Sequence, residues 1–458
     1  MKIIVCGAGQ VGSSIARHLA GENNDVTVVD QSPELVRSLS DTHEVRGVVG
    51  FASHPGVLEQ AGAGDADMVV AVTYHDEVNM VACQVAHSLF KVPTKIARIR
   101  EQNYLEPIWA DLFSRDHMPI DVIISPETEV ARAIWRGLQI PGAFDSIPLA
   151  GDKVRVIGVR CSEDCPVINT PLRQLTGLFP DLNILVVGII RKDQLIVPNA
   201  NEQMLAGDEV YFVVDSSQVS RAMMAFGYEE LETRRTIIIG GGNIGLYLAT
   251  LIEENFPGMS VKLIELNEDR ARRAEQILQK SVVLCGDALD PDILNEANVG
   301  HAETVVAVTN EDETNILASL LAKRHGAKRI LTLVNNATYR PLITDLGIDV
   351  VVTPKAITVS TILQHVRRGR IRSVHSLGEG MGEIIELEAL ETSPLVGQRL
   401  TDIELPPGAI IGAIVREDEV LIPSGSTVIK GNDLVALFAS ADVVKKVEKM
   451  FSVRLEYF

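Results

Sequence analysis

The sequence predicts an α/β protein with two doubly wound parallel sheets, each followed by a small α+β domain. Two observations carry this prediction: a glycine-rich turn of the form G-x-G-x-x-G occurs twice, and the sequence blocks after it recur in the same order. A third is the alternation of apolar, β-branched runs with helical segments, which is typical of parallel sheets joined by crossover helices. At 458 residues the chain is long enough for about three or four domains.

The first glycine-rich turn lies at the start of the chain. The apolar run 3–6 predicts a strand, and the segment 13–19 predicts the helix after it. The first glycine permits a sharp turn, the second lets a pyrophosphate approach the helix N-terminus, and Gly12 lets the helix pack close to the sheet. The predicted binding residues of this turn are Gly7, Ala8, Gly9, Gln10 and Val11.

The second turn repeats this pattern between the apolar run 237–239 and the helical segment 246–252. Gly245 supplies the third glycine. A single motif of this kind occurs often by chance, but two copies in the same strand–turn–helix context predict two Rossmann-type nucleotide cradles. The predicted binding residues are Gly240, Gly241, Gly242, Asn243 and Ile244.

An acidic residue ends the next predicted strand after each turn. Asp30 follows the run 25–29, and Glu265 follows the run 261–264, both close to the ~20-residue spacing of dinucleotide-binding folds. A carboxylate there accepts hydrogen bonds from a ribose diol and repels a 2′-phosphate. Residues 31–33 also supply no arginine for such a phosphate. The pattern therefore favours NAD(H), ATP or ADP over NADP(H).

Long blocks after the two turns also match. The strand signal 66–73 recurs as 302–309, and the helix start 76–79 recurs as 312–315. Each half therefore predicts a complete doubly wound sheet. The sheets end at two further matching segments, 121–126 and 349–354.

After each sheet, an amphipathic stretch predicts a crossover helix, and a strand-rich segment follows. These segments match as well: 189–198 recurs as 414–423, and 206–210 aligns with 430–434, which pairs Asp208 with Asn432. The predicted boundaries are 1–126 for nucleotide-binding domain 1, 127–142 for a crossover helix and linker, 143–229 for small domain 1, 230–233 for a linker, 234–354 for nucleotide-binding domain 2, 355–372 for a second crossover helix and linker, and 373–458 for small domain 2.

Composition excludes several classes of function. The net charge of −19 opposes binding to nucleic acid. No apolar stretch approaches the ~18 residues of a spanning helix, and no signal-peptide pattern precedes the first strand, so we expect a cytoplasmic protein. Cys161 and Cys165 lie four residues apart, but no second cysteine or histidine pair follows at ligand spacing, so we expect no metal site.

Over essentially all 458 residues, the chain resembles the RCK-type (KTN) regulatory domains of potassium channels and transporters. The strongest carriers are residues 1–12, the block 309–315 and the doubled domain order, and the tandem form is similar to the cytosolic subunits of bacterial Trk potassium uptake systems. The resemblance implies that each KTN domain binds NAD(H), or ATP or ADP. It also implies a membrane-embedded potassium transporter as partner, a peripheral position on the inner face of the membrane, and a homo-tetramer.

The resemblance adds residues to both sites and shows where this chain departs from the family. It assigns Thr73, Tyr74 and Arg98 to the first site, and Thr309 and Asn310 to the second. Tyr74 departs from the pattern that the second copy keeps. The apolar stretch 332–334 stands where the first copy has its arginine, so we expect an arginine near the ligand in the first site alone and two unequal sites.

An NAD-dependent oxidoreductase is the alternative, because Rossmann domains mostly serve enzymes and a fold alone does not settle function. Hydride transfer needs a substrate domain with a proton donor or acceptor held opposite the nicotinamide. The strand-rich segments offer no convergent set of His, Lys and Asp, and the counterpart of His75 in the second half is Glu311. We therefore expect no catalytic residues and a regulatory role.

Overall fold

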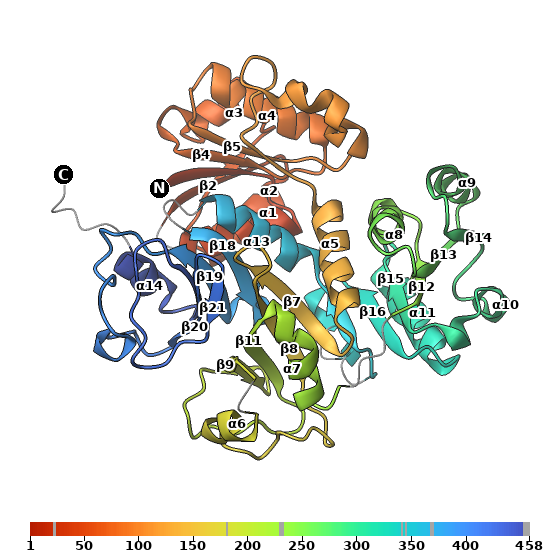
Figure 1. Ribbon diagram of the computed structural model, residues 1–458. Helices are drawn as coiled ribbons and strands as arrows, with labels where there is room; N and C mark the ends of the chain where they lie inside the picture. The colour runs from red at the N-terminus through yellow and green to blue at the C-terminus, as the bar shows by residue number, and fades with distance from the viewer. Residues whose placement is uncertain are drawn as a thin grey trace. The chain divides into compact units, whose positions relative to one another are not determined.

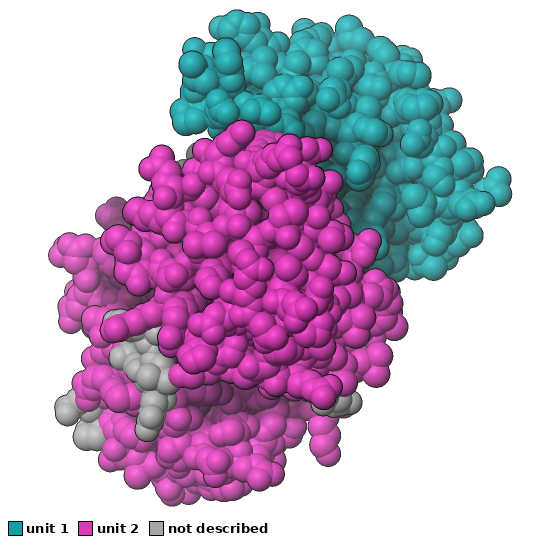
Figure 2. Space-filling view, turned by 90° about the vertical axis from the view of Figure 1, so that its right-hand side faces the viewer, with its two compact units in different colours: residues 1–130, 353–366 teal, residues 131–352, 367–458 magenta. Residues whose placement is uncertain are grey.

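The computed structural model describes residues 1–21, 24–179, 182–228, 233–339, 342–343, 346–366 and 371–451. The chain forms two compact units, which Figure 2 shows in different colours. The first unit comprises Met1–Val130 and Thr353–Val366, and the second comprises Ala131–Val352 and Arg367–Phe458. Of the predicted linker 230–233, only Thr233 lies within the described residues.

The first unit is built on a six-stranded parallel sheet with the order β3-β2-β1-β4-β5-β6, which is the strand order of a Rossmann fold. Helices α3 and α4 cover one face, and α1, α2 and α13 cover the other (Figure 1). The central strands are apolar on both faces because both are buried. The elements are β1 (Lys2–Cys6), α1 (Gln10–Gly21), β2 (Asp25–Asp30), α2 (Pro33–Thr42), β3 (Arg46–Val49), α3 (Pro55–Gln60), β4 (Met68–Ala71), α4 (Asp76–Ser88), β5 (Thr94–Arg98), β6 (Val122–Ile124) and α13 (Pro354–Val366).

The second unit contains a parallel sheet with the equivalent order, β14-β13-β12-β15-β16-β17. Its core again alternates buried strand residues with the inner faces of helices, such as Ile237, Val305 and Ala318. The elements are β12 (Arg235–Ile239), α8 (Asn243–Asn255), β13 (Ser260–Glu265), α9 (Glu268–Ile277), β14 (Val282–Cys285), α10 (Pro291–Glu296), β15 (Thr304–Ala307), α11 (Asp312–Arg324), β16 (Arg329–Leu333) and β17 (Val350–Val352).

Two antiparallel five-stranded sheets complete the second unit, with the orders β10-β9-β11-β8-β7 and β18-β19-β22-β20-β21. One face of each sheet contributes to a shared apolar core that includes Val187, Val213, Ala413 and Phe438. The elements are β7 (Ala143–Leu149), β8 (Val154–Arg160), α6 (Leu172–Leu178), β9 (Ile184–Arg191), β10 (Gln194–Ile196), β11 (Glu209–Asp215), α7 (Val219–Ala225), β18 (Ile371–Leu377), β19 (Gly382–Glu388), β20 (Ala409–Arg416), β21 (Glu419–Leu421), β22 (Leu434–Ser440) and α14 (Val444–Phe451). The predicted fold class is therefore confirmed.

The helix after each parallel sheet packs against the other parallel sheet's helices. Helix α13 follows β17 in the chain but packs on α1 and β6 of the first sheet, where Ile362 and Leu363 are fully buried. Helix α5 (Pro126–Gln139) follows β6, and its last turns lie in the second unit. There the Trp135 ring meets the Phe256 ring edge to face, with centroids 4.7 Å apart, at the end of α8. The two crossover helices are thus exchanged between the repeats.

The two small domains repeat with a register that differs by one residue from the predicted alignment. Asp208 accepts two hydrogen bonds from Arg191, at 2.9 and 2.8 Å, and Asp433 accepts the same pair from Arg416. The predicted pairing of Asp208 with Asn432 is therefore wrong, and Asp433 is the true counterpart. The reason is the turn before the carboxylate: Gly207 and Asn432 both adopt left-handed backbone, which glycine and asparagine tolerate.

An Arg416→Met substitution should destabilise the second small domain by about 3 kcal/mol, because it strands the carboxylate of Asp433, which is only 1 % exposed. Arg372→Met is the matched control, since Arg372 pairs with Glu388 at the surface of the same sheet and such pairs contribute less than about 1 kcal/mol. Thermal unfolding of the two variants checks the difference. Equal melting temperatures would contradict the role of the buried pair.

No helix within the described residues is long and apolar enough to span a lipid bilayer.

Candidate nucleotide-binding sites

The first glycine turn leaves open space at Gly9, the position where a phosphate would approach. Gly7 has a φ of +111°, and its N–H donates to the carbonyl of Val29 at 2.7 Å. A Cβ at Gly12 would lie 1.9 Å from the Gly7 oxygen, whereas a Cβ at Gly9 would meet nothing within 4 Å. Gly12 therefore holds α1 against the turn, and Gly9 faces free space beside the helix N-terminus, where the helix dipole favours an anion.

The second turn has the same geometry. Gly240 has a φ of +105°, and its N–H donates to the carbonyl of Ile264 at 2.8 Å. A Cβ at Gly245 would lie 1.9 Å from the Gly240 oxygen, and a Cβ at Gly242 would meet nothing within 4 Å. Both copies thus keep the packing glycine and the open glycine, and no described residue lies within 4 Å of a Cβ placed at the open glycine.

The acidic residue of the first site is partly committed to the turn. Oδ2 of Asp30 accepts the Ala8 N–H at 2.6 Å, and Oδ1 accepts the Ser32 N–H at 2.8 Å. Each carboxylate oxygen can accept more than one hydrogen bond, and the side chain is half-buried at the end of β2. Asp30 can therefore still receive the two hydroxyls of a ribose.

The acidic residue of the second site is held more tightly. Glu265 is 3 % exposed, and its Oε2 accepts the Gly241 N–H at 2.7 Å. Its Oε1 accepts hydrogen bonds from the Asn267 N–H and from the Arg270 guanidinium, at 2.8 and 2.7 Å. Burial raises the pKa of Glu265, but the hydrogen bonds from Arg270, Asn267 and Gly241 outweigh it, so the pKa lies below its ordinary value.

The expectation that an arginine lies near the ligand in the first site alone is wrong. Arg270 lies in the first turn of α9, on the acid that a ribose would contact. The inequality of the two sites therefore lies also at the acid, which accepts only backbone N–H groups in the first copy and is also paired with an arginine in the second. The available signal was an arginine five residues after the acid, where the first copy has Leu35 at the equivalent position.

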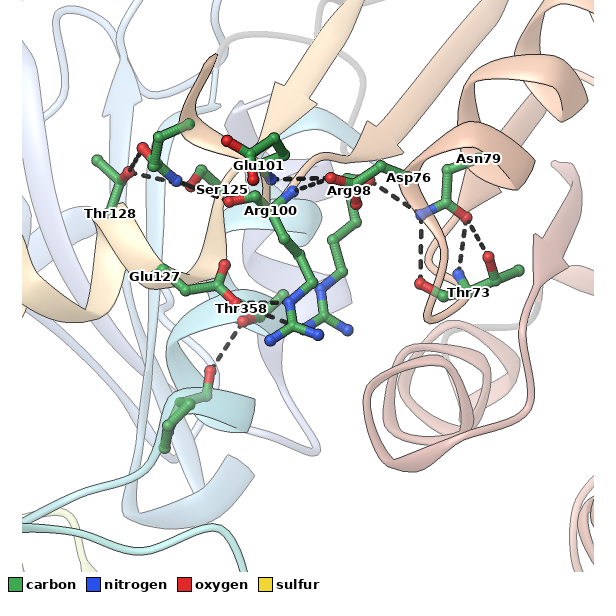
Figure 3. A network of polar contacts seen from close by, with 12 residues as sticks. Thr73, Asp76, Asn79, Arg98, Arg100, Glu101, Ser125, Glu127, Thr128 and Thr358 are labelled. Carbon is green, nitrogen blue, oxygen red and sulfur yellow. Dashed lines mark hydrogen bonds and ion pairs between the residues drawn. The ribbon is translucent and has the colours of Figure 1, made fainter. Parts of the chain in front are cut away.

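A buried asparagine that was not predicted as a site residue fixes the loop beside each cradle. Oδ1 of Asn79 accepts the Thr73 N–H and hydroxyl at 2.8 and 2.7 Å, and its Nδ2 donates to the Thr73 and Arg98 carbonyls at 3.2 and 2.9 Å (Figure 3). Asn315 makes the same four bonds to Thr309 and Leu333. Both asparagines are fully buried. The recurrence of 76–79 as 312–315 was the signal for this clamp.

The side chains of Asn79 and Asn315, which form this clamp, hold the predicted loop residues at the carboxyl ends of the sheet strands. Thr73 and Tyr74 follow β4, which neighbours β1 and its glycine turn, and Thr309 and Asn310 follow β15 in the same way. The Tyr74 side chain is 73 % exposed, and the Arg100 guanidinium lies 5.2 Å from the centre of its ring. The Asn310 side chain is also exposed.

A polar cluster made of Arg98, Arg100, Glu127 and Asp76 lies at the carboxyl end of β5 in the first sheet (Figure 3). The Arg100 Nε donates to the Glu127 Oε1 at 2.8 Å, and an Arg98 Nη lies 4.0 Å from the same oxygen. Burial lowers the pKa of Arg98 although Glu127 opposes the shift, which shows how strongly this cation is desolvated. Glu127 is near the start of α5, the helix that both units share.

Three buried polar atoms of this cluster have no hydrogen-bond partner within the described part of the chain: the Arg98 Nε, the Asp76 Oδ1 and the Glu127 Oε2. Such atoms are costly to leave unpaired, so they indicate a place where a polar ligand or water belongs. In the second copy, Leu333 and Asn335 take the places of Arg98 and Arg100. The cluster is thus a property of the first site.

Within the described residues, no group of three or more His, Cys, Asp and Glu side chains is placed to hold a metal ion.

The fold and the two sites define a class of protein, namely a tandem of Rossmann-type nucleotide cradles with associated small α+β domains. The TrkA-N domain model matches residues 3–126 and 236–354, and the TrkA-C domain model matches residues 156–227 and 384–452. The chain belongs to the TrkA family. The resemblance to tandem regulatory subunits of Trk systems is thereby confirmed, and the oxidoreductase alternative is not supported.

Curated relatives match over the whole length. The chain is 54% identical over 458 residues to the Trk system potassium uptake protein TrkA of Azorhizobium caulinodans, which covers 100% of both chains. It is 44% identical over 455 residues to the protein of the same name from Vibrio alginolyticus, which covers 98% of each chain.

Solved structures share the fold at low identity. The GsuK RCK domain matches with a TM-score of 0.61 and 19% identity, covering 98% of this chain and 94% of that one. The GsuK channel bound to NAD matches with a TM-score of 0.60 and 18% identity, covering 98% of this chain and 78% of that one. These matches show that the fold is shared.

Proposed function

We propose that the chain is the nucleotide-sensing regulatory subunit of a potassium uptake system, and that it gates a membrane-embedded Trk-type potassium transporter. The single observation that carries the proposal is the open space over Gly9 and over Gly242, each beside an acid at the end of the next strand. NAD(H) is the proposed ligand, with ATP and ADP as further candidates. The family's potassium uptake proteins support the assignment of the partner.

The residues of each site bind different parts of the ligand. The turns from Gly7 to Val11 and from Gly240 to Ile244 receive the phosphates at the helix N-termini. Asp30 and Glu265 receive a ribose, and the clamped loops at Thr73 and Thr309 border the ligand on the side of the next strand. In the first site, Arg98 lies at the end of β5 as a cation for the ligand's negative charge.

Ligand binding regulates only if one conformation binds the ligand better than another. A tenfold preference corresponds to about 1.4 kcal/mol, and two cradles in one chain multiply the bias if they move together. The Arg98–Glu127 contact supplies a path for this bias. A ligand that takes up the charge of Arg98 weakens its attraction to Glu127, and so acts on α5, which continues from the first unit into the second.

The proposal also specifies where in the cell the chain works and how many copies assemble. The chain works in the cytoplasm and reaches the inner face of the membrane through its transporter, as a homo-tetramer. Light scattering of the purified protein tests the assembly. Potassium flux in vesicles that hold the transporter with this chain, with and without NADH or ATP, tests the gating. Equal flux under all conditions would overturn it.

Substitution of the two acids tests the ligand assignment. Asp30→Ala should weaken NADH binding to the first site about tenfold or more and lower the melting temperature less than Glu265→Ala does, because the half-buried Asp30 side chain binds only two backbone N–H groups. Glu265→Ala should both weaken binding and lower the melting temperature, since it removes a buried ion pair with Arg270 and leaves two backbone N–H groups without their acceptor. Calorimetric titration with NADH, NAD+, ATP and ADP measures the binding.

Asp25→Ala is the control, because Asp25 is an acidic residue at the opposite end of the same strand β2. Its affinity should equal that of the unmodified protein. Failure of all four nucleotides to bind the unmodified protein would refute the sensor. Unchanged binding in both acid variants would refute the ribose assignment alone.

A further inference from the structure

A cavity lies at the amino ends of the strands of the second parallel sheet, opposite the end that carries the glycine turn. It has a volume of about 510 Å³, within the range of small-molecule sites. Its lining includes the first residues of β15 and β16, Thr304 and Arg329, together with Lys328. The first small domain contributes Arg160 and Tyr228. The glycine turn follows the carboxyl end of β12, so this cavity is separate from the nucleotide cradle.

An unsatisfied hydroxyl marks the cavity as incomplete. Thr304 is 1 % exposed, and its Oγ1 has no hydrogen-bond partner among the described residues. A buried hydroxyl without a partner costs free energy, and native proteins rarely keep one unless a water or a ligand completes it. Thr304 is among the residues that line the cavity, so a group bound there is a candidate partner for this hydroxyl.

The cavity also holds more positive charge than its own carboxylates balance. Glu303 pairs with Arg235 and Asp349 with Lys323, and Arg160 pairs with Glu209. Lys328 and Arg329 form no ion pair with a described carboxylate, which leaves two cations in surplus at this surface.

Arg329 is tied to neutral groups. Its guanidinium donates to the Gly137 carbonyl at 2.9 Å and to the Ala143 carbonyl. Burial lowers its pKa to about 10, so the charge is held at a cost. A guanidinium has five N–H donors, of which these two carbonyls accept two.

These features belong to this sheet and not to the fold in general. The register of the repeats places Met68, Pro93 and Thr94 of the first sheet where Thr304, Lys328 and Arg329 stand in the second. Thr304 therefore places a hydroxyl where the first sheet has a methionine. Lys328 and Arg329 place two cations where it has uncharged residues. In a chain of net charge −19, such a local surplus of cations attracts an anion.

We propose that this cavity binds the phosphate group of a small anion, with Lys328 and Arg329 as the cationic partners and Thr304 as the hydroxyl donor. Phosphate accepts several charge-assisted hydrogen bonds, and arginine, lysine and hydroxyl donors together match its oxygens. Because the cavity joins the first small domain to the second parallel sheet, an occupied site ties these parts of the second unit together.

Phosphate titration of the full-length chain tests the site, provided that the cradles are disabled first. The double variant Gly9→Asp/Gly242→Asp places a carboxylate in each cradle, where a side chain meets no atom within 4 Å. Calorimetry with inorganic phosphate should still detect one site per chain in this background. Adding Lys328→Gln should weaken that binding about tenfold, and Lys328→Arg should restore it. Glycerol phosphate in a parallel titration distinguishes a phosphate ester from the free ion by which of the two binds more tightly.

Thr304→Val supplies an independent readout. It should raise the melting temperature of the phosphate-free protein, because an unsatisfied hydroxyl is removed, and it should weaken phosphate binding at the same time. Lys328 is exposed, so its substitution leaves the fold intact. Absence of phosphate binding in the cradle variant would overturn the proposal, as would Lys328→Gln and Thr304→Val variants that bind phosphate as tightly as their parent.

Discussion

Gly12→Ala is expected to destabilise the first nucleotide-binding domain by at least about 3 kcal/mol, whereas Gly9→Ala leaves its stability unchanged and abolishes nucleotide binding at the first site. The added Cβ at residue 12 would lie 1.9 Å from the carbonyl oxygen of Gly7, and this backbone is itself held by the Val29 carbonyl. The added Cβ at residue 9 would meet no protein atom within 4 Å, but it occupies the approach of a phosphate.

Thermal unfolding and calorimetric titration with NADH separate the two effects. Gly245→Ala and Gly242→Ala form the matched pair in the second domain, where the distances are the same. We expect the packing variants to melt earlier and the open-space variants to fold normally but lose one binding site each. A Gly9→Ala variant that binds NADH with unchanged affinity at both sites would show that the ligand lies elsewhere.

Asn79→Ala should destabilise the carboxyl edge of the first sheet by about 3 kcal/mol. It removes four hydrogen bonds at a fully buried position and leaves the Thr73 N–H and the Arg98 carbonyl without their partner. Each buried group left unpaired costs about 1–3 kcal/mol. The loop that borders the ligand should then lose its fixed position, and NADH affinity at the first site should fall with it.

Hydrogen exchange resolves this effect in a chain of several domains, where a single unfolding free energy is not well defined. The amides of β4, β5 and the loop after β4 should exchange faster in Asn79→Ala, while those of β15 and β16 keep their rates. Asn315→Ala should give the reverse pattern. Faster exchange spread evenly over both domains, or no change at Thr73, would contradict a local clamp.

Much of both sites could be predicted from sequence because their signals are local. The glycines, the first helical turn and the acid at the next strand end are contiguous or nearly so, and each has a separate physical requirement. Gly7, Gly9 and Gly12 show those requirements as a positive φ, an open space and a close contact. The glycine motif became a specific sign of nucleotide binding because it occurs twice in the same strand–turn–helix context.

Other features depend on side chains that meet only after folding. Arg270 is in contact with Glu265 because α9 returns over the end of β13, and no property of the residue type announces it. In the sequence, Asn79 looks like an ordinary polar residue of a helix. In the structure, its side chain forms hydrogen bonds with Thr73 and Arg98, which follow or end two neighbouring strands. The partner of Arg416 was misassigned by one residue because the turn before Asp433 sets the register.

The sequence by itself determined the doubled architecture, the position of both cradles and their acids, and the family to which the chain belongs. These follow from backbone requirements of glycine, from strand and helix periodicity, and from the repeat. Only the tertiary structure decided that α13 packs on the first sheet and α5 against α8, and that the two acids differ in their partners. An amphipathic helix specifies an apolar face but not its neighbour, because any complementary apolar surface satisfies it equally well.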